Sequence, residues 1–422
     1  MKSPQHYFYL FFIALLLFGC NSSNNTSNLN FAYKYDPEPS IIRPSFKVFH
    51  LSENKSNLYF SIHSKDVLYT KIFNDTNYES RLKIRYKLFY QDDIKTILDS
   101  ATYQMNDTTS EGNFDKQLFG GFTLNALNSQ KYFVEIRIRD INRDLNIVEF
   151  FNFTKSESIS DGHFILLDSS NFPILESQVH VNKKFKVVRS PWVDKDNFKL
   201  NHYGTNTFGL APPPFSEDGI NYELPKQTKT DQVILFTDTT TLTVKEKGLY
   251  HFISDSTDRG FCFLAVSPNY PKLDNIEQFI APTRFISTQK EYDKLTSYTN
   301  SKEGIDEFWL SITNDFKRAK QVLGTYYGRV ESSNRFFTDV QEGWQTDRGL
   351  IYLIFGAPST IFKGYNYEKW IYGEESNMLT ISFSFKRIET PTSTNTYILE
   401  RNPTYKSSWY KAVDNWRQGR VY

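Results

Sequence analysis

The chain has 422 residues, too many for one ordinary hydrophobic core, so two or three domains are expected. Its 49 Lys and Arg residues nearly balance its 48 Asp and Glu residues, which excludes a globally basic nucleic-acid-binding protein and an acidic-tail protein. Aromatic residues make up 17% of the chain, and this composition favours strands.

A lipoprotein signal peptide is predicted over residues 1–19. Residues 7–18 form an apolar run that is too short to span a bilayer as a mature helix. The run ends in the sequence LFGC, which resembles a lipobox, so Cys20 is predicted to carry a lipid that anchors the protein to a membrane. A plain secretory signal or an N-terminal anchor helix is the alternative. Residues 20–40 are expected to form a flexible tether, because residues 21–28 contain neither a charged nor an apolar side chain.

The sequence after Cys20 also indicates a location. Lipoproteins exported to the cell surface often carry acidic residues just after the lipidated Cys, and none is present here. We therefore expect an outer-membrane protein that faces the periplasm, with exposure on the cell surface as the alternative. The second cysteine, Cys262, lies in the apolar sequence GFCFLAV and is predicted to be a buried structural thiol.

The middle of the chain has the patterns of two β domains. Residues 41–157 contain short segments that alternate apolar and polar side chains, which is typical of an immunoglobulin-like β-sandwich. Residues 158–287 contain further strand patterns and are predicted to form a second β-sandwich. A proline-broken loop at residues 211–215 is expected to be a surface excursion of this second sandwich.

The pattern changes in residues 288–422. Two helix-capping signals, TQKE at Thr288 and NSKE at Asn300, come before a run of apolar residues with helical spacing over residues 305–330, which predicts one amphipathic helix of about 30 residues. Residues 350–355 are apolar throughout and predict a strand that is buried on both faces. The expected fold is therefore multidomain and mainly β: two tandem immunoglobulin-like sandwiches followed by a small α+β domain.

This last region carries a recognisable motif. The sequence GWQTD at residues 343–347, followed by Arg348 and Gly349, resembles the signature of the GWxTD domain family. The resemblance continues through the apolar run, the GAP sequence at residues 356–358, the WIYG sequence at residues 370–373 and the closing aromatic residues. It implies a secreted bacterial protein, often a lipoprotein with β domains ahead of the signature domain, and it implies no known enzymatic activity.

The residue types of the signature suggest physical roles. The candidate site residues are Gly343, Trp344, Thr346, Asp347, Arg348 and Gly349. The first glycine is expected to adopt a backbone conformation closed to other residues, and the tryptophan to be an apolar anchor. The threonine and aspartate are expected to cap a turn, and the arginine to pair with that aspartate or with a nearby carboxylate. The second glycine is expected to lead into the predicted strand.

An earlier copy of part of the signature favours a structural role for it. The sequence TDRG occurs at residues 257–260 as well as at residues 346–349, and each copy comes before an apolar run. The repetition predicts a turn that leads into a strand in both places. The alternative is a protein-binding surface in which Trp344 and Arg348 are the anchors.

The sequence does not predict an active site. No His follows His251, and motifs for zinc, calcium, nucleotides or a serine nucleophile do not occur, so no catalytic residue, metal or cofactor is predicted. Three pairs of carboxylates keep a hydrolase open as a remote alternative: Asp92 with Asp93, Glu374 with Glu375, and Glu342 with Asp347.

Three hypotheses about function follow. The favoured hypothesis is a non-catalytic accessory or scaffold lipoprotein that binds other envelope proteins through its β-sandwiches and its C-terminal domain. A glycan-binding lipoprotein is the second, because aromatic side chains stack on sugars. A carboxylate-dependent hydrolase is the third. The other C-terminal tryptophans are expected to form the core of the last domain: Trp309, Trp370, Trp409 and Trp416.

Overall fold

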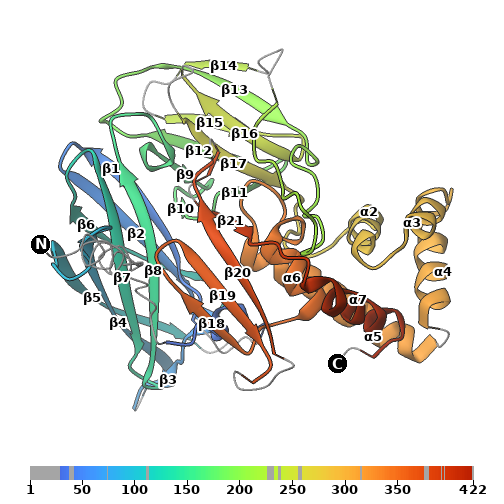
Figure 1. Cartoon of the computed structure of the whole chain (residues 1–422). Helices are drawn as coiled ribbons and strands as arrows, with labels where there is room; N and C mark the ends of the chain where they lie inside the picture. The colour runs from blue at the N-terminus through green and yellow to red at the C-terminus, as the bar shows by residue number, and fades with distance from the viewer. Residues whose placement is uncertain are drawn as a thin grey trace, which may run out of the picture.

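A computed structural model describes most of the chain, and its described part is mainly β with a helical C-terminal region (Figure 1). The described residues are 29–37, 42–73, 75–110, 114–225, 232–235, 239–254, 259–313, 316–374, 380–390, 392–393 and 395–420. The predicted signal peptide (1–19) and the lipidation site, Cys20, lie outside these residues. Of the helices in the described part, none has the length and apolar character needed to cross a bilayer.

The first β region packs two antiparallel sheets around one core. One sheet has the order β1-β2-β6. Its strands are β1 (Ser45–Ser52), β2 (Lys55–His63) and β6 (Gln117–Asn125). The other sheet contains β3 (Thr70–Lys71), β4 (Asn77–Tyr90), β5 (Asp99–Ser110), β7 (Gln130–Asp140) and β8 (Leu145–Lys155). A short 3-10 turn, η2 (Ser64–Asp66), follows β2.

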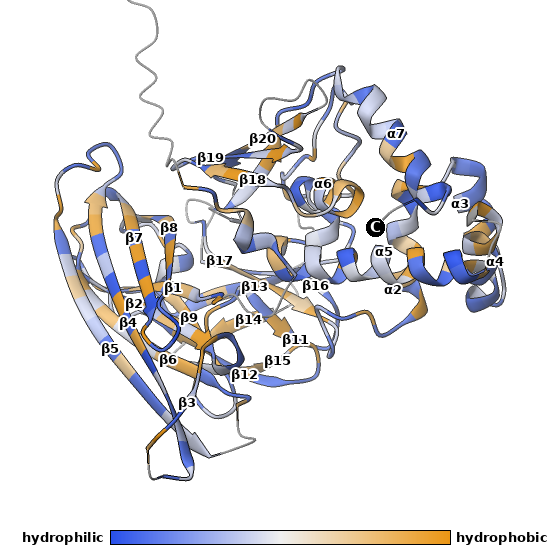
Figure 2. Ribbon diagram, turned by 90° about the horizontal axis from the view of Figure 1, so that it is seen from below, coloured by the Kyte–Doolittle hydropathy of each residue, from blue (hydrophilic) through white to orange (hydrophobic). Residues whose placement is uncertain are grey.

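The alternating sequence pattern explains this packing. Buried and exposed residues alternate along the middle of β4, so one face of the strand points inward (Figure 2). Phe60 of β2 meets Ile84 of β4 and Val134 of β7 in one hydrophobic cluster. The prediction of a β domain built on period-two strands is confirmed here.

The second β region also has two sheets. The order of the first is β10-β9-β12-β15 and that of the second is β11-β17-β16-β13-β14. The first contains β9 (Phe164–Leu167), β10 (Pro173–Ile174), β12 (Lys184–Arg189) and β15 (Thr239–Thr243). The second contains β11 (Gln178–His180), β13 (Asn197–Tyr203), β14 (Gln232–Leu235), β16 (Gly248–Ile253) and β17 (Phe261–Val266). A 3-10 turn, η3 (Asp161–His163), precedes β9.

The interior of this region is aromatic. Phe164, Phe185, Phe198 and Phe263 share one cluster between the two sheets. Cys262 is buried as predicted, and its burial raises the pKa of the thiol well above the usual value, so it stays protonated at neutral pH.

The helices lie at the other end of the molecule from the first β region (Figure 1). They are α2 (Ile276–Ile280), η4 (Ala281–Phe285), α3 (Gln289–Thr296), α4 (Ser301–Thr313), α5 (Phe316–Phe337), η5 (Gly343–Gln345), α6 (Asp347–Phe355) and α7 (Tyr405–Arg417). The capping box at Thr288 is confirmed, because its side chain accepts from Glu291 N and the Glu291 carboxylate accepts from Thr288 N. The single helix expected over 305–330 is wrong, because α4 and α5 are separate helices.

The predicted strand at 350–355 is also wrong, because these residues belong to helix α6. A helix that is apolar on every side must be covered on every side, and α6 meets this condition. Leu350 and Leu353 belong to the helical core, whereas Ile351 and Tyr352 belong to a second cluster that includes Trp370 of the last sheet. An apolar run is therefore compatible with a buried helix as well as with a buried strand.

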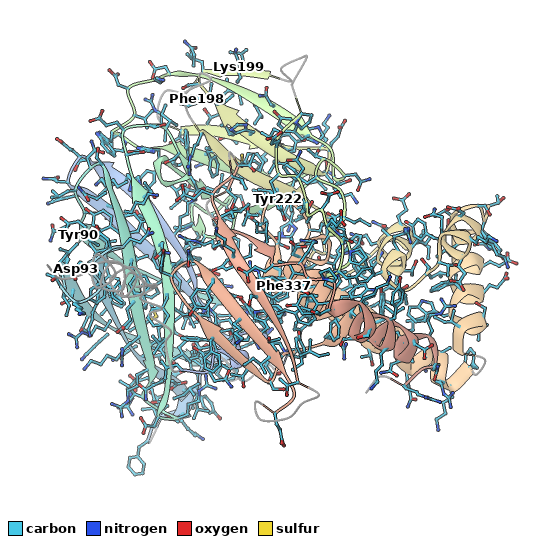
Figure 3. All side chains as sticks on the ribbon, in the orientation of Figure 1. Tyr90, Asp93, Phe198, Lys199, Tyr222 and Phe337 are labelled. Atoms are coloured by element: carbon cyan, nitrogen blue, oxygen red, sulfur yellow. The ribbon has the colours of Figure 1, made fainter. Side chains whose placement is uncertain are left out.

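The last sheet is antiparallel and has the order β18-β19-β20-β21. Its strands are β18 (Thr360–Lys363), β19 (Tyr367–Tyr372), β20 (Ile381–Ile388) and β21 (Thr396–Leu399). Phe337, at the end of α5, contacts Tyr352 of α6 and Trp370 of β19 and thereby joins helices and sheet (Figure 3). The four tryptophans expected in the core, Trp309, Trp370, Trp409 and Trp416, are all buried.

The predicted tether needs one correction. Residues 29–37 are not a free linker, because they dock on the C-terminal region through the 3-10 turn η1 (Ala32–Tyr35). Phe31 is buried, and its backbone N–H donates to Ile361 O at 2.9 Å. Tyr35 is also buried and contacts Phe337 and Trp370. The two aromatic side chains explain the docking, because they remove apolar area from water.

Candidate functional site

The signature segment (residues 343–349) is a buried junction between η5 and α6. Thr346 is the N-cap of α6: its hydroxyl accepts from Gly349 N at 3.1 Å and donates to Gly343 O at 2.7 Å. The threonine thus performs the predicted capping, although it caps a helix and not a turn into a strand.

The two glycines of the signature are required by close packing. A Cβ at Gly343 would lie 1.9 Å from Ser333 O, and a Cβ at Gly349 would lie 1.9 Å from Gly343 O. Both contacts are with backbone atoms, which cannot move aside cheaply. The expectation that Gly343 adopts a conformation closed to other residues is wrong, because positive φ angles occur at other glycines and not at this one. The glycines instead let α5, η5 and α6 approach one another.

Trp344 lies inside the helical core and is only 4% exposed. Its indole Nε1 donates to Glu342 Oε2 at 2.8 Å, and its ring meets Phe285 edge-on. Its backbone N–H donates to Asn334 Oδ1 of α5. In this position the side chain holds η5 against α5 and does not present a surface to a partner.

Asp347 connects three distant parts of the chain. Its carboxylate is fully buried, accepts from Leu399 N at 2.8 Å and forms an ion pair with Arg401. Arg401 Nη2 also donates to Pro212 O at 3.2 Å, and Ala211 N donates to Gln345 O. The proline-broken loop, predicted to be a surface excursion, is therefore packed against the signature.

Arg348 pairs with Glu368 of β19 and not with its neighbour Asp347. The Arg348 Nη1 to Glu368 Oε1 distance is 3.5 Å, and the guanidinium lies 4.0 Å from the centroid of the Tyr397 ring. Lys363 Nζ approaches the same carboxylate to 2.9 Å, and Tyr35 OH and Trp370 Nε1 also donate to it. Each charge of the signature therefore has a partner. Arg348 takes the second of its two predicted partners, a nearby carboxylate, whereas Asp347 binds Leu399 and Arg401 and does not cap a turn as predicted.

Glu368 stays ionised inside the protein. Burial alone would raise its pKa, but the opposing charges of Lys363 and Arg348 lower the pKa to about 2. Sequence reasoning missed both Glu368 and Arg401, because they are 20 and 54 residues away from their partners. The one sequence signal for Glu368 is the alternation of β19, which places Glu368 and Trp370 on the same face of the strand and so predicts that the carboxylate is buried.

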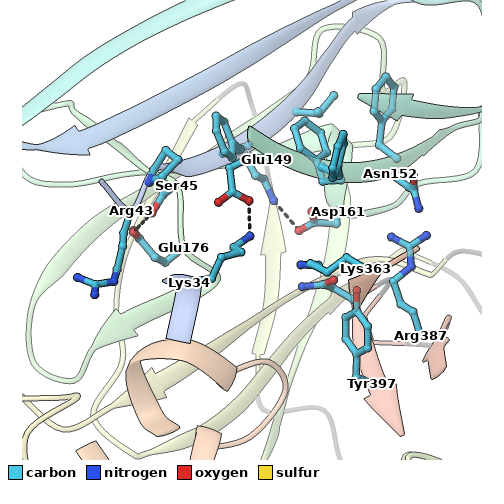
Figure 4. A pocket seen from close by; sticks show the side chains of 18 of the residues that line it. Lys34, Arg43, Ser45, Glu149, Asn152, Asp161, Glu176, Lys363, Arg387 and Tyr397 are labelled. Carbon is cyan, nitrogen blue, oxygen red and sulfur yellow. Dashed lines mark hydrogen bonds and ion pairs between the residues drawn. The ribbon is translucent and has the colours of Figure 1, made fainter. Parts of the chain in front are cut away.

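A cavity of about 1050 Å³ lies where the two β regions meet the C-terminal region (Figure 4). The first β region contributes residues of β1, β7 and β8, and the second contributes η3 and Arg259. Lys363, Arg387 and Tyr397 of the last sheet line the same cavity, as does Arg348 of the signature. Sequence reasoning did not predict this cavity, because no single segment contains its lining.

Comparison with family models identifies the C-terminal region. The model of the GWxTD domain matches residues 248–418, which include the whole signature segment. The chain contains a GWxTD domain. The match begins at Gly248, so it takes in β16 and β17, which lie ahead of the boundary at residue 288 drawn from the sequence.

Comparisons with curated proteins and with solved structures identify no further domain of the chain. No curated protein matches the chain. Solved structures with similarity include a Bacteroides uniformis beta-glucuronidase (8% identity, TM-score 0.19), covering 41% of this chain and 16% of that one. A red sea bream transglutaminase has 9% identity and a TM-score of 0.19, covering 51% and 29%. This chain thus spans less than a third of either structure, and scores this low carry no argument about fold or function.

The acidic pairs considered from the sequence do not converge beside the GWxTD signature. The Glu342 carboxylate accepts a hydrogen bond from Trp344 Nε1, and Asp347 forms an ion pair with Arg401. Asp93 lies next to Tyr90 at the outer side of the first β region, where it accepts from backbone N–H groups of its own turn (Figure 3). Glu375 lies outside the described residues. Within those residues, no group of three His, Cys, Asp or Glu side chains is placed to hold a metal ion.

Two histidines that look scattered in the sequence come together between the β regions. The rings of His50 and His163 are 5.1 Å apart, and both contact Trp192. Burial lowers the pKa of His50 to about 3, with smaller contributions from the charges of His163 and Lys155. His50 is therefore neutral at physiological pH and acts as a packing residue at this contact.

Proposed function

We propose that the protein is a non-catalytic lipoprotein of the bacterial cell envelope that acts as an accessory or scaffold protein for other envelope proteins. The observation that carries this proposal is the burial of the signature: its polar groups are used to join chain segments. Thr346, Asp347 and Arg348 hold together α6, the last sheet and the N-terminal segment. Arg401, the partner of Asp347, adds the proline-broken loop. A junction of this kind supports a rigid body that presents its outer surface to partners.

The proposal includes a lipid anchor on Cys20 and a position on the outer membrane that faces the periplasm. The lipobox-like sequence before Cys20 and the absence of acidic residues directly after it support both parts. We further propose that each β region is an immunoglobulin-like sandwich. The pairing of two antiparallel sheets around one core in the first region is consistent with this.

The helical end of the GWxTD domain is the surface we favour for protein binding. Helices α3 and α4 extend away from the sheets and form the outer edge of the molecule (Figure 1). At this end Phe316, the first residue of α5, is 75% exposed. An exposed aromatic side chain at the start of the helix that follows α3 and α4 is a suitable anchor for a partner.

The proposal can be tested by crosslinking the tagged, lipidated protein in native membranes and purifying the complexes. Trp344→Ala and Arg348→Ala are poor probes because both residues are buried. The better variant is Phe316→Ser, with Phe73→Ser as matched control, since Phe73 is a 90% exposed phenylalanine in the first β region. We expect a stoichiometric envelope partner that is lost with Phe316→Ser and retained with Phe73→Ser. Failure to recover any partner would count against the scaffold function.

Glycan binding is the second candidate, and the cavity is the observation that favours it. Phe133 and Phe150 stack on each other at 5.4 Å beside the cavity, and Tyr365 and Tyr397 also line it. Aromatic faces of this kind can stack on sugar rings. A glycan array with the purified protein would separate this candidate from the first, since a scaffold protein is not expected to retain any glycan.

A further inference from the structure

At the end of the cavity nearest the last sheet, positively charged side chains come from both β regions and from the C-terminal region. Lys131 comes from β7, Arg259 from the residues before β17, and Lys363 and Arg387 from β18 and β20. Figure 4 shows Lys363, Arg387 and Tyr397 together on one side of the cavity. Residues this far apart in the sequence meet only in the folded protein.

The carboxylates at this end do not balance the cations. Arg259 pairs with Glu389 at 2.8 Å, and Lys131 reaches the same carboxylate at 3.8 Å. Arg348 and Lys363 share Glu368 in the same way.

A full charge count of this end includes three further carboxylates. Glu149 is paired with Lys34, Asp161 is paired with Lys47, and Asp339 lies close enough to Arg348 to affect the pKa of the arginine. The count gives seven cations (Lys34, Lys47, Lys131, Arg259, Arg348, Lys363 and Arg387) and five carboxylates (Glu149, Asp161, Asp339, Glu368 and Glu389), so an excess of two positive charges remains.

Arg387 is the cation that is available to a ligand. Within the described part of the chain its guanidinium makes no hydrogen bond or ion pair, although its backbone N–H donates to Asn366 O. It lies directly across from Tyr397 on β21 and is half-buried, so its donors are held at the cavity wall. Lys363 remains cationic beside it: burial lowers its pKa, but Glu368 and Tyr35 more than offset this, and the pKa is well above the usual value.

We propose that this end of the cavity binds an anionic ligand through a carboxylate or phosphate group, with Arg387 as the principal contact and Lys131 and Lys363 as supporting charges. A guanidinium can donate two parallel hydrogen bonds to either group. Neighbouring cations with low-dielectric walls raise the local concentration of anions. The aromatic residues of the cavity would pack against the remainder of the ligand. The proposal goes beyond the scaffold function and does not depend on it.

The test is a calorimetric titration of the full-length protein with three probes at constant ionic strength: inorganic phosphate, glucuronate and neutral glucose. We expect phosphate, glucuronate or both to bind, glucose not to bind, and the affinity to fall as sodium chloride is raised. Binding of phosphate alone would indicate a phosphate ligand, and binding of glucuronate alone an acidic sugar. The proposal is overturned by binding of neither anion, or by binding of glucose as strong as that of the anions.

Variants of Arg387 test whether the anion binds at this end of the cavity. Arg387→Gln should weaken the binding of the anion about tenfold or more, because it removes a charge-assisted contact. Arg387→Lys should retain part of the affinity, and Arg85→Gln, which changes an exposed arginine on β4 away from the cavity, should not alter it. Among the described residues the Arg387 guanidinium makes no hydrogen bond or ion pair, and its charge acts on Glu389 only at longer range. Both of its variants should therefore fold, which the melting temperature will verify. Unchanged affinity in Arg387→Gln would refute the site.

Discussion

The sequence TDRG occurs twice in this protein, and the two copies lead into different structures. The copy at residues 257–260 comes before strand β17, whereas the copy at residues 346–349 begins helix α6. In the first copy, Gly260 has a φ of +70° and donates its N–H to Ile159 O. In the second, Gly349 lies in the first turn of the helix and donates to Thr346 Oγ1.

The difference lies in the surroundings of the two copies. Strand β17 enters between β16 and β11, which supply hydrogen bonds on both of its edges. The second copy follows Gly343 and Trp344, which fasten η5 to α5 and place Thr346 where it can cap a helix. Local turn chemistry therefore did not decide either structure. The neighbouring strands explain the strand after the first copy, and the packing of Gly343 and Trp344 explains the helix of the second, which gives a physical reason why the signature includes the glycine and tryptophan.

The largest difference between the copies should come from their arginines. Arg348→Ala removes a buried partner of Glu368 and the packing on Tyr397, so we expect it to lower the free energy of unfolding by about 3 to 5 kcal/mol. Arg259→Ala removes an ion pair whose side chains are 44% and 31% exposed, and should cost less than about 1 kcal/mol. Urea unfolding of both variants measures this, and equal losses would remove the distinction between a buried and a surface copy.

The carboxylate partners should differ in their response to acid. The pKa of Glu368 in the folded protein is about 2, below its ordinary value of 4.5, so the unfolded chain takes up the proton first as the pH falls. The stability that Glu368 contributes is therefore complete above pH 4.5 and is lost, to a total of about 3 kcal/mol, as the pH falls to 2.

Two variants isolate this contribution. The stability difference between wild type and Glu368→Gln should shrink between pH 4.5 and pH 2, as followed by urea unfolding. The corresponding difference for Glu389→Gln, at the exposed pair of Arg259, should change much less. A difference for Glu368→Gln that stays constant with pH would contradict the assigned pairing.

Gly349 tests the close packing of the second copy. A glycine-to-alanine change inside a helix normally stabilises it by about 1 kcal/mol. At Gly349 the added methyl would meet Gly343 O, so we expect a loss of about 2 kcal/mol. The control is Gly324→Ala in α5, where a Cβ would meet nothing within 4 Å and the usual gain is expected. A stabilised Gly349→Ala variant would show that the approach of η5 to α6 is looser than described.

The smallest effect is expected at the helix cap. Thr346→Ala removes the hydroxyl that accepts from Gly349 N and should cost about 1 kcal/mol. Thr346→Ser keeps the hydroxyl and should retain most of the stability. Thermal unfolding followed by circular dichroism compares the two, and equal melting temperatures would mean that the cap does not contribute.

Much of the fold follows from local patterns in the sequence. The alternation along β4 and β7 predicts strands, and the capping box at Thr288 predicts the start of α3. Local patterns did not predict the helix at residues 350–355, because an apolar segment without alternation fits a buried helix as well as a buried strand. The docking of Phe31 and Tyr35 could not be predicted either, since their hydrogen-bond partners Ile361 and Glu368 lie about 330 residues away along the chain.

The candidate site was predictable only in part. The sequence singles out the signature and the capping role of Thr346, because both are local features. It does not reveal that Asp347 pairs with Arg401, or that Arg348 pairs with Glu368, because both pairs depend on how the last sheet packs on α6. The cavity was beyond prediction for the same reason, since it exists only between regions.

The docked N-terminal segment would also limit how far the last sheet can lie from a membrane. Cys20 lies ten positions before Asn30, whose side chain is hydrogen-bonded to Ser359 and Ile361 beside and within β18. A fully extended chain of this length reaches about 35 Å, and a flexible one about 17 Å on average. A lipid on Cys20 would therefore keep the edge of the last sheet at β18 within about 35 Å of the bilayer surface, although β18 lies more than 300 residues from the anchor in sequence. The point of attachment would be the last sheet and not β1, the first strand after the anchor in sequence, so a partner embedded in that membrane would find the last sheet within reach.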